Sequence, residues 1–306
     1  MGYHCSLLVA KQQPNTLVVI SSRTDPDNAA ATINKTLGQN NVVYMPLDLS
    51  SLAKVRDFAK RWVDAKYPPI QSLVFNAAGQ WAGATQYTDD RIEKNFAVNH
   101  VGHALLFHLL APQLQEDARI VIVGSGIHDV REKWGPAPAY TTPAEVAQPT
   151  AEQEFISGGM ARYGASKLAN IAWMLALASR LSTLPGHTSK TVIAMDPGFM
   201  PGSGLFRNAP AVMRFVVGKL FPKMISVLRA LYHKNTHTMQ ESGENLAWLV
   251  GSGEVKGKKG LYYEGRVEHR VGEVAGRKEV QEELWRWTVE RVGESVDERR
   301  RFDRVE

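Results

Sequence analysis

At 306 residues, 44% of them hydrophobic and 22% charged, the chain is long enough to bury the core of one large domain and too apolar to be disordered. The single cysteine, Cys5, excludes an internal disulfide and suits a reducing compartment. No apolar stretch approaches the ~20 residues of a membrane-spanning helix, and the N-terminus lacks the pattern of a signal peptide. We therefore expect a cytosolic protein.

The formal charge of +5 does not by itself indicate a nucleic-acid partner. The basic residues gather mainly in 256–304, where they alternate with glutamates, which is typical of a solvated helix face. The sequence carries no nucleic-acid-binding motif, so we predict no such partner.

Short apolar runs rich in branched residues alternate with helical patterns along the chain. The predicted strands are 16–20, 41–45, 72–75, 120–123 and 191–195, and the predicted helices are 1–13, 26–37 with Asp25 as cap, 52–66, about 89–114 and about 163–181. A polar, proline-rich insertion occupies 135–153, and a helical tail occupies about 276–306. This alternation predicts one α/β domain over 1–306, a doubly wound parallel sheet of Rossmann-like type with helices on both faces.

Polar residues follow the predicted strands where each strand ends. Asn76 begins an Asn-Ala-Ala-Gly turn after one strand, Ser125 closes another, and Pro197 and Gly198 follow a third. Ligands bind at the carboxyl ends of strands in open α/β sheets, so these residues mark the expected site.

Tyr163 and Lys167 stand four residues apart at the start of a strongly helical segment, which places both side chains on one helix face. A tyrosine hydroxyl has a pKa near ~10, so it works as an acid or base at neutral pH only beside a fixed cation. Lys167 supplies that cation. A Tyr-x-x-x-Lys pair alone also occurs as a solvated pair on a helix.

Together with the turn at Asn76, Asn99 in a helical pattern, Ser125 and the Pro197-Gly198 pair, this motif resembles the short-chain dehydrogenase/reductase family. The branch most similar contains protochlorophyllide reductases and retinol-dehydrogenase-like proteins. The resemblance implies that Tyr163 donates a proton to a carbonyl oxygen and that Ser125 orients the carbonyl. It implies that Lys167 lowers the pKa of Tyr163 and binds the nicotinamide ribose, and that Asn99 holds a proton-relay water. Tyr140 is a rival phenol, but no lysine follows it at this spacing.

The resemblance also implies a dinucleotide cofactor. At the end of the 16–20 strand, Ser22 and Arg23 favour the 2′-phosphate of NADP (NADPH), whereas Asp25 counts mildly against it. The other cofactor-binding residues that the resemblance implies are Gly2, Asp48, Leu49, Asn76, Ala77, Gly79, Tyr163, Lys167, Pro197, Gly198 and Ser203.

Compared with the family, the N-terminus is shortened. Gly2 matches the last glycine of the phosphate-binding loop, so the first strand and most of that loop are absent, and that strand would be central in a 3-2-1-4-5-6 sheet. We favour a truncated start over a protein that functions without the strand. The alternative function is a catalytically impaired member that acts as a binding or regulatory module.

The remaining motifs carry weaker signals. His100 with His103, and His233 with His237, lack acidic or cysteine partners at informative spacing, so we predict no metal. The segment at about 199–235 is apolar with Arg214, Lys219, Lys223 and Arg229 interspersed, which reads as amphipathic helices. In the family this region covers the substrate, so we expect a small apolar substrate, with contact to a membrane surface as the weaker alternative. Whether the chain forms a homo-oligomer stays open, as does the choice between carbonyl and carbon–carbon double-bond reduction.

Overall fold

The apolar runs form seven strands among the described residues, which are 1–132, 135–204, 215–231 and 233–306 of this computed structural model, without the side chains of 153–157. The strands are β1 Val18–Ile20, β2 Val42–Tyr44, β3 Ile70–Phe75, β4 Leu114–Val123, β5 Thr191–Asp196, β6 Lys259–Glu264 and β7 Val267–His269. Strands β3, β4, β5 and β6 are parallel neighbours in that order, and β7 adds antiparallel to β6. Strands β1 and β2 form a separate parallel pair.

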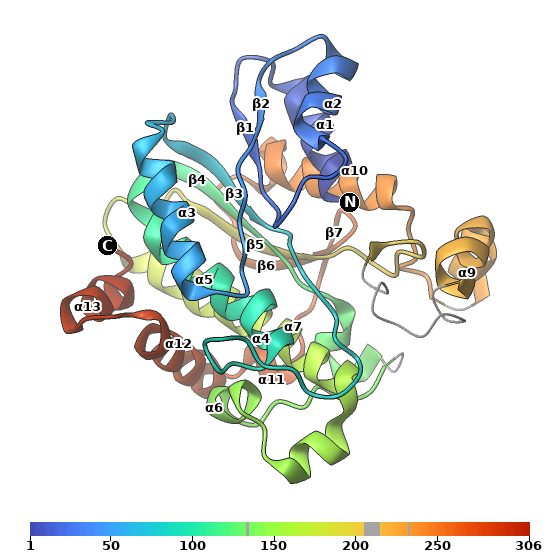
Figure 1. Cartoon of the computed structure of the whole chain (residues 1–306), viewed down its shortest axis with the longest axis vertical. Coiled ribbons are helices and arrows are strands. Elements are labelled where there is room, and N and C mark those ends of the chain that lie inside the picture. The colour runs from blue at the N-terminus through green and yellow to red at the C-terminus, as the bar shows by residue number, and fades with distance from the viewer. Residues whose placement is uncertain (133–134, 205–214, 232) are drawn as a thin grey trace.

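Helices cover both faces of the sheet (Figure 1). Their bounds are α1 Gly2–Gln12, α2 Ala29–Leu37, α3 Leu52–Asp64, α4 Lys94–Phe96, α5 Gly102–Leu110, α6 Pro143–Ala147, α7 Ala151–Thr183, α9 Ile225–Leu231, α10 Met239–Gly251, α11 Glu273–Gly276, α12 Lys278–Val292 and α13 Val296–Arg304. Side chains cap several of them. Asp25 accepts a hydrogen bond from the Ala29 N–H at 2.9 Å, as the sequence predicts, although Asn28 is the residue that directly precedes α2.

Residues 120–123 of β4 and all of β5 are buried on both faces of the sheet, which explains why they read as continuous apolar runs. Ile120 and Ile122 point into the core that α3, α5, α7 and α12 cover. Their neighbours Val121 and Val123 point into a second core, which α1 and α10 cover. The alternation of side chains along a strand therefore builds two hydrophobic layers from one sheet.

The sheet is divided between β1 and β3. Among the described strands, β1 pairs only with β2 and β3 pairs only with β4, so one edge of each is unpaired. A cavity of about 790 Å³ lies between them, lined by residues that include Val18, Ile20 and Val74.

Three segments differ from the prediction. The helix expected at 89–114 begins at Lys94, because residues 87–93 form a turn closed by a bridge between Tyr87 and Glu93, and strand β4 starts at Leu114. The polar insertion at 135–153 contains α6 and the first residues of α7. The basic segment 256–304 is not one solvated helix face, since β6 and β7 precede α12 and α13, and Tyr262 is buried.

Candidate active site

A cavity of about 1480 Å³ opens at the carboxyl edge of the parallel strands. It runs from the end of β1 to the ends of β4 and β5, so one continuous space joins parts of the chain that are far apart in sequence. The predicted site residues that line it are Gly2, Ser22, Arg23, Asp48, Leu49, Asn76, Ala77, Gly79, Ser125, Tyr163, Lys167, Pro197, Gly198 and Ser203. Asn99 lies behind this lining.

Tyr163 and Lys167 project from α7 after the helix is interrupted at Gly158, whose φ is 52°. Both side chains are buried, and the Lys167 Nζ lies 5.8 Å from the centre of the Tyr163 ring. Lys167 Nζ also donates a hydrogen bond of 2.9 Å to the carbonyl oxygen of Val123, at the end of β4. The spacing therefore brings phenol and ammonium together, as predicted, and the strand end holds the ammonium in place.

Burial shifts the pKa of each group in the direction that favours its uncharged form. Desolvation raises the pKa of Tyr163 above its ordinary value, the buried Asp196 carboxylate raises it further, and a hydrogen-bond interaction with Ser125 acts in the opposite direction. Desolvation lowers the pKa of Lys167 to about 8, against the attraction of Asp196. Tyr163 is thus a protonated phenol at neutral pH, with Ser125 and a cation beside it.

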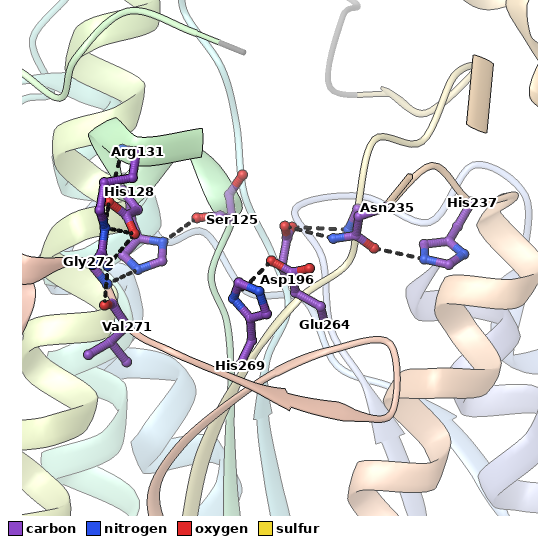
Figure 2. A network of polar contacts seen from close by, with 12 residues as sticks. Ser125, His128, Arg131, Asp196, Asn235, His237, Glu264, His269, Val271 and Gly272 are labelled. Atoms are coloured by element: carbon purple, nitrogen blue, oxygen red, sulfur yellow. Dashed lines mark hydrogen bonds and ion pairs between the residues drawn. The ribbon is translucent and has the colours of Figure 1, made fainter. Parts of the chain in front are cut away.

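Ser125 stands in an extended conformation at the end of β4, where a histidine fixes the turn that follows it (Figure 2). His128 Nδ1 is 2.7 Å from the carbonyl oxygen of Ser125, and the Gly272 N–H donates to His128 Nε2 at 2.8 Å. These partners assign a neutral ring protonated at Nδ1, and burial lowers the pKa of His128 in agreement. The histidine therefore ties the Ser125 turn to the segment before α11.

Asn99 lies in a π-helical turn, Ala97–Val101, that joins α4 to α5. Its side-chain oxygen accepts from the Gly79 N–H at 2.9 Å, and its Nδ2 donates to the Gly79 carbonyl and to Ser166 Oγ, both at 3.0 Å. The amide thereby joins the cofactor-side turn to the helix of Tyr163. π-Turns recur at functional sites, and here the turn positions a buried polar clamp. That Asn99 also holds a relay water stays a prediction.

Asp196 is a buried carboxylate that the sequence analysis missed, although it ends β5 directly before Pro197. Its Oδ1 accepts from the Gly198 N–H at 3.0 Å and its Oδ2 from Asn235 Nδ2 at 2.9 Å (Figure 2). Gly198 has a φ of 76°, and a Cβ there would lie 2.4 Å from the Asn235 carbonyl oxygen, so the turn requires glycine. An acidic residue at the end of a buried strand was the signal that could have found Asp196.

Ser22 and Arg23 lie at the far end of the cavity, after β1. Arg23 is exposed there, whereas the Ser22 hydroxyl donates to the Thr24 carbonyl at 2.7 Å. Asp25 does not line this cavity, because its carboxylate caps α2. Asp48 lines the cavity with its carboxylate bound to Ser50 and to the Lys54 ammonium at 2.9 Å.

Gly2 begins α1 at the cavity wall, beside the turn at Asn76. A Cβ on Gly2 would lie 2.8 Å from Asn76 Nδ2, so the helix approaches the turn as closely as glycine allows. No side chain caps the N-terminus of α1, which leaves its first N–H groups available to an anion. Ser203 lines the cavity after Met200, while 205–214, with Leu205, Phe206, Arg207 and Arg214, lie outside the described residues.

The other candidate groups lie apart from this chemistry. His100 contacts Thr288 Oγ1 at 3.1 Å and His103 contacts the Asn99 carbonyl at 3.1 Å, so both are core histidines. Tyr140 does not line the cavity, and its buried hydroxyl has no hydrogen-bond partner among the described residues. The described residues include one group with metal-ligand atoms within 4.8 Å of one another, formed by Glu132, Glu264 and the exposed His269.

Comparison with known proteins identifies the family. Residues 1–142 match the family model described as short chain dehydrogenase. Polyprenol dehydrogenase of Mus musculus is 30% identical over 261 residues, which cover 83% of this chain and 69% of that protein. The chain belongs to the short-chain dehydrogenase/reductase family. Retinol dehydrogenase 14 of Homo sapiens is 28% identical over 251 residues, which cover 81% of this chain and 66% of that protein.

Solved structures of other short-chain dehydrogenases/reductases have the same fold as this chain. A short chain dehydrogenase from Burkholderia cenocepacia, solved in complex with NADP, superimposes with a TM-score of 0.56 at 21% identity, over 85% of this chain and 92% of that one. Some curated relatives are longer, since the chain spans about half, 52%, of dehydrogenase/reductase SDR family member 13 of Bos taurus. In the part of the chain that the structure describes, no helix has the length and apolar character needed to span a membrane.

Proposed function

We propose that the chain is an NADP-dependent oxidoreductase that transfers a hydride between nicotinamide and a carbonyl or alcohol of a small apolar substrate. The observation that carries this proposal is the convergence of Ser125, Tyr163 and Lys167 in one cavity. Family membership supports oxidoreductase activity with a nicotinamide cofactor.

A nicotinamide bound here would supply or accept the hydride. Tyr163 holds the proton that a carbonyl oxygen needs as negative charge develops on it, and Ser125 offers that oxygen a second hydrogen bond. The Lys167 ammonium, 5.8 Å from the centre of the phenol ring, stabilises the phenolate that proton transfer leaves behind. Because burial and Asp196 keep Tyr163 protonated, these residues are set for carbonyl reduction at neutral pH.

The residues around the cavity fit a dinucleotide. The uncapped N-terminus of α1 at Gly2 suits a pyrophosphate, and the exposed Arg23 suits a 2′-phosphate. Asp25, the residue that would favour NAD, is held at the N-terminus of α2. We therefore expect Arg23→Ala to weaken NADPH binding far more than NADH binding in a fluorescence titration. Equal losses for both cofactors would remove the 2′-phosphate role.

Large apolar side chains line part of the cavity. They are Trp81, Met160, Phe199, Val217 and Phe221. An apolar lining with few convergent polar groups is typical of a site for a hydrophobic ligand. Two relatives, polyprenol dehydrogenase and retinol dehydrogenase 14, are named for alcohols of this character.

Tyr163→Phe tests the proposal with NADPH and a panel of apolar aldehydes and ketones. Removing the proton donor should lower kcat by about 10²–10⁴ without unfolding the chain. Tyr140→Phe is the matched control, because it removes a buried hydroxyl that lies outside the cavity. A Tyr163→Phe variant that kept most of its activity would show that another group donates the proton.

The second candidate is a chain that binds NADPH poorly and acts as a binding or regulatory module. The division of the sheet between β1 and β3 favours it. We propose separately that the cavity between β1 and β3 accepts one further strand. Their facing unpaired edges and apolar lining suit an extended β-branched segment.

An NADPH titration of the 306-residue chain separates the two candidates, since tight saturable binding would refute the impaired one. The same titration on a chain extended at Met1 by a short valine-rich strand and a glycine turn tests whether the cavity accepts a strand. A matched extension with proline in the strand is the control, because proline cannot complete the ladder. If both extensions changed binding and melting temperature equally, the cavity would not be a strand site.

We propose a cytosolic location, on the grounds of the single cysteine and the absence of a spanning helix among the described residues. We propose no nucleic-acid partner, and self-association stays an open prediction. Fractionation of cells tests the location, and sedimentation of the purified chain tests self-association.

A further inference from the structure

The segment that covers the substrate end of the cavity exposes a stripe of large apolar side chains. It consists of a π-helical turn, Val216–Leu220, a 3₁₀ turn, Phe221–Met224, and α9. Phe215 is 67% exposed and Leu231 is 84% exposed, and Leu220, Met224 and Val227 are exposed between them. In Figure 1, α9 stands at the edge of the molecule, on the side away from α12 and α13.

Val227 and Leu231 lie four residues apart in α9, which places them on one face of that helix. Leu220 and Met224, which end the two preceding turns, come before Val227 at intervals of four and three residues. Phe215 precedes Leu220 by five residues, the span of the i→i+5 hydrogen bonds that define the π turn between them. Large apolar residues exposed singly are ordinary, whereas a contiguous stripe marks an interaction surface.

The same region carries only positive charge. Between residues 197 and 240 the sequence has six lysines and arginines and no aspartate or glutamate. Lys219, Lys223 and Lys234 are exposed beside the stripe, and no ion-pair partner for them occurs among the described residues. Arg229 is held by Glu241 at 2.8 Å. This surface therefore complements a binding partner that has an apolar interior and an anionic exterior.

The opposite side of the segment is anchored to the protein. Val217 is buried, Val216 and Phe221 line the cavity, and the Phe221 ring packs against Phe199 with 6.4 Å between centroids. One short segment thus covers the cavity with its inner side and presents the stripe with its outer side.

We propose that residues 215–231 dock the protein on the surface of an anionic lipid bilayer. The stripe enters the boundary between headgroups and acyl chains, while Lys219, Lys223 and Lys234 contact lipid phosphates and carboxylates. A bilayer fits better than a second copy of the chain, because two copies packed stripe to stripe would bring lysines of like charge together. Docking of this kind needs no spanning helix and places the apolar wall of the cavity beside the lipid.

Flotation of the 306-residue chain with vesicles tests the proposal. We expect binding to vesicles of phosphatidylcholine mixed with phosphatidylserine, weaker binding to phosphatidylcholine alone, and a loss of binding as salt rises. The double variant Val227→Ser with Leu231→Ser should lower partition into the mixed vesicles by about tenfold or more. The matched control is Val267→Ser with Val296→Ser, two valines exposed elsewhere on the surface, which should bind as the parent does.

A charge variant, Lys219→Gln with Lys223→Gln, should weaken binding to the mixed vesicles by about fivefold for each lysine. Circular dichroism confirms that each variant is folded. The proposal is overturned if the parent chain does not bind the mixed vesicles, or if the stripe variant and its control bind equally. A dimer in sedimentation that only the stripe variant loses would assign the surface to a second copy instead.

Discussion

Replacing Lys167 by methionine removes a charge that the fold buries at a cost. The Lys167 pKa of about 8, against an ordinary value of 10.5, means that the folded chain disfavours the ammonium by about 3 kcal/mol, at ~1.4 kcal/mol for each tenfold change in equilibrium. Methionine keeps most of the apolar stem. It loses the hydrogen bond to the Val123 carbonyl, which lowers the free energy of unfolding by about 1–3 kcal/mol. We expect a chain that is inactive and slightly more stable than the parent at pH 7.

The pH dependence is the sharper measurement. A lysine whose pKa is lowered by folding destabilises the folded state fully below that folded pKa, and the penalty fades as pH rises toward the unfolded value. Between pH 7 and pH 9 the parent should therefore gain about 1.4 kcal/mol in free energy of unfolding relative to Lys167→Met. Urea unfolding at both pH values measures the difference, with Lys60→Met on the exposed side of α3 as the control substitution. If the difference in free energy of unfolding between the parent and Lys167→Met were the same at pH 7 and pH 9, Lys167 would not be a buried ammonium with a lowered pKa.

Three further substitutions test other parts of the site. Asn99→Ala removes the clamp on Gly79 and should lower the free energy of unfolding by about 2–4 kcal/mol in urea; a loss under about 0.5 kcal/mol would argue against the clamp. Thr238→Ala breaks the capping box of α10 and should cost about 1 kcal/mol, visible as a lower melting temperature, whereas an unchanged melting temperature would contradict that role. Asp196→Asn removes a charge that raises the pKa of Lys167, so the alkaline limb of the reduction rate, where Lys167 loses its proton, should move to lower pH; an unmoved limb would show that the two groups are not coupled.

The parts of the fold that the sequence predicted are those with local signals. The runs in β4 and β5 are apolar on both faces, and the Tyr163 helix has its own periodic pattern, so neither needs information from the rest of the chain. Most of the predicted site residues line one cavity for the same reason, since each follows a recognisable strand or turn or lies in a helical motif, whereas Asn99 lies behind the lining.

The parts that were missed depend on distant contacts. Strand β6 lies in a charge-rich segment and is a strand because it pairs with β5, far earlier in the chain. Ala194 of β5 is the partner of Tyr262, and Met195 is the partner of Tyr263. The role of Asp196 likewise appears only when Gly198 and Asn235 are seen to bind its two oxygens. Neither pairing leaves a periodic signal in the sequence.

The division of the sheet has a consequence for local unfolding. Strands β1 and β2 form a two-stranded unit with its own small core of Ala10, Ala30, Ile33 and Val42, and a parallel pair of this size is marginal by itself. Its amides should exchange with solvent through openings that leave β4 and β5 closed. A dinucleotide that reaches from Arg23 on this unit to Lys167 on the larger sheet would join the two sheets. Bound cofactor should then raise the free energy of opening of β1 and β2 by its binding free energy, which slows their hydrogen exchange.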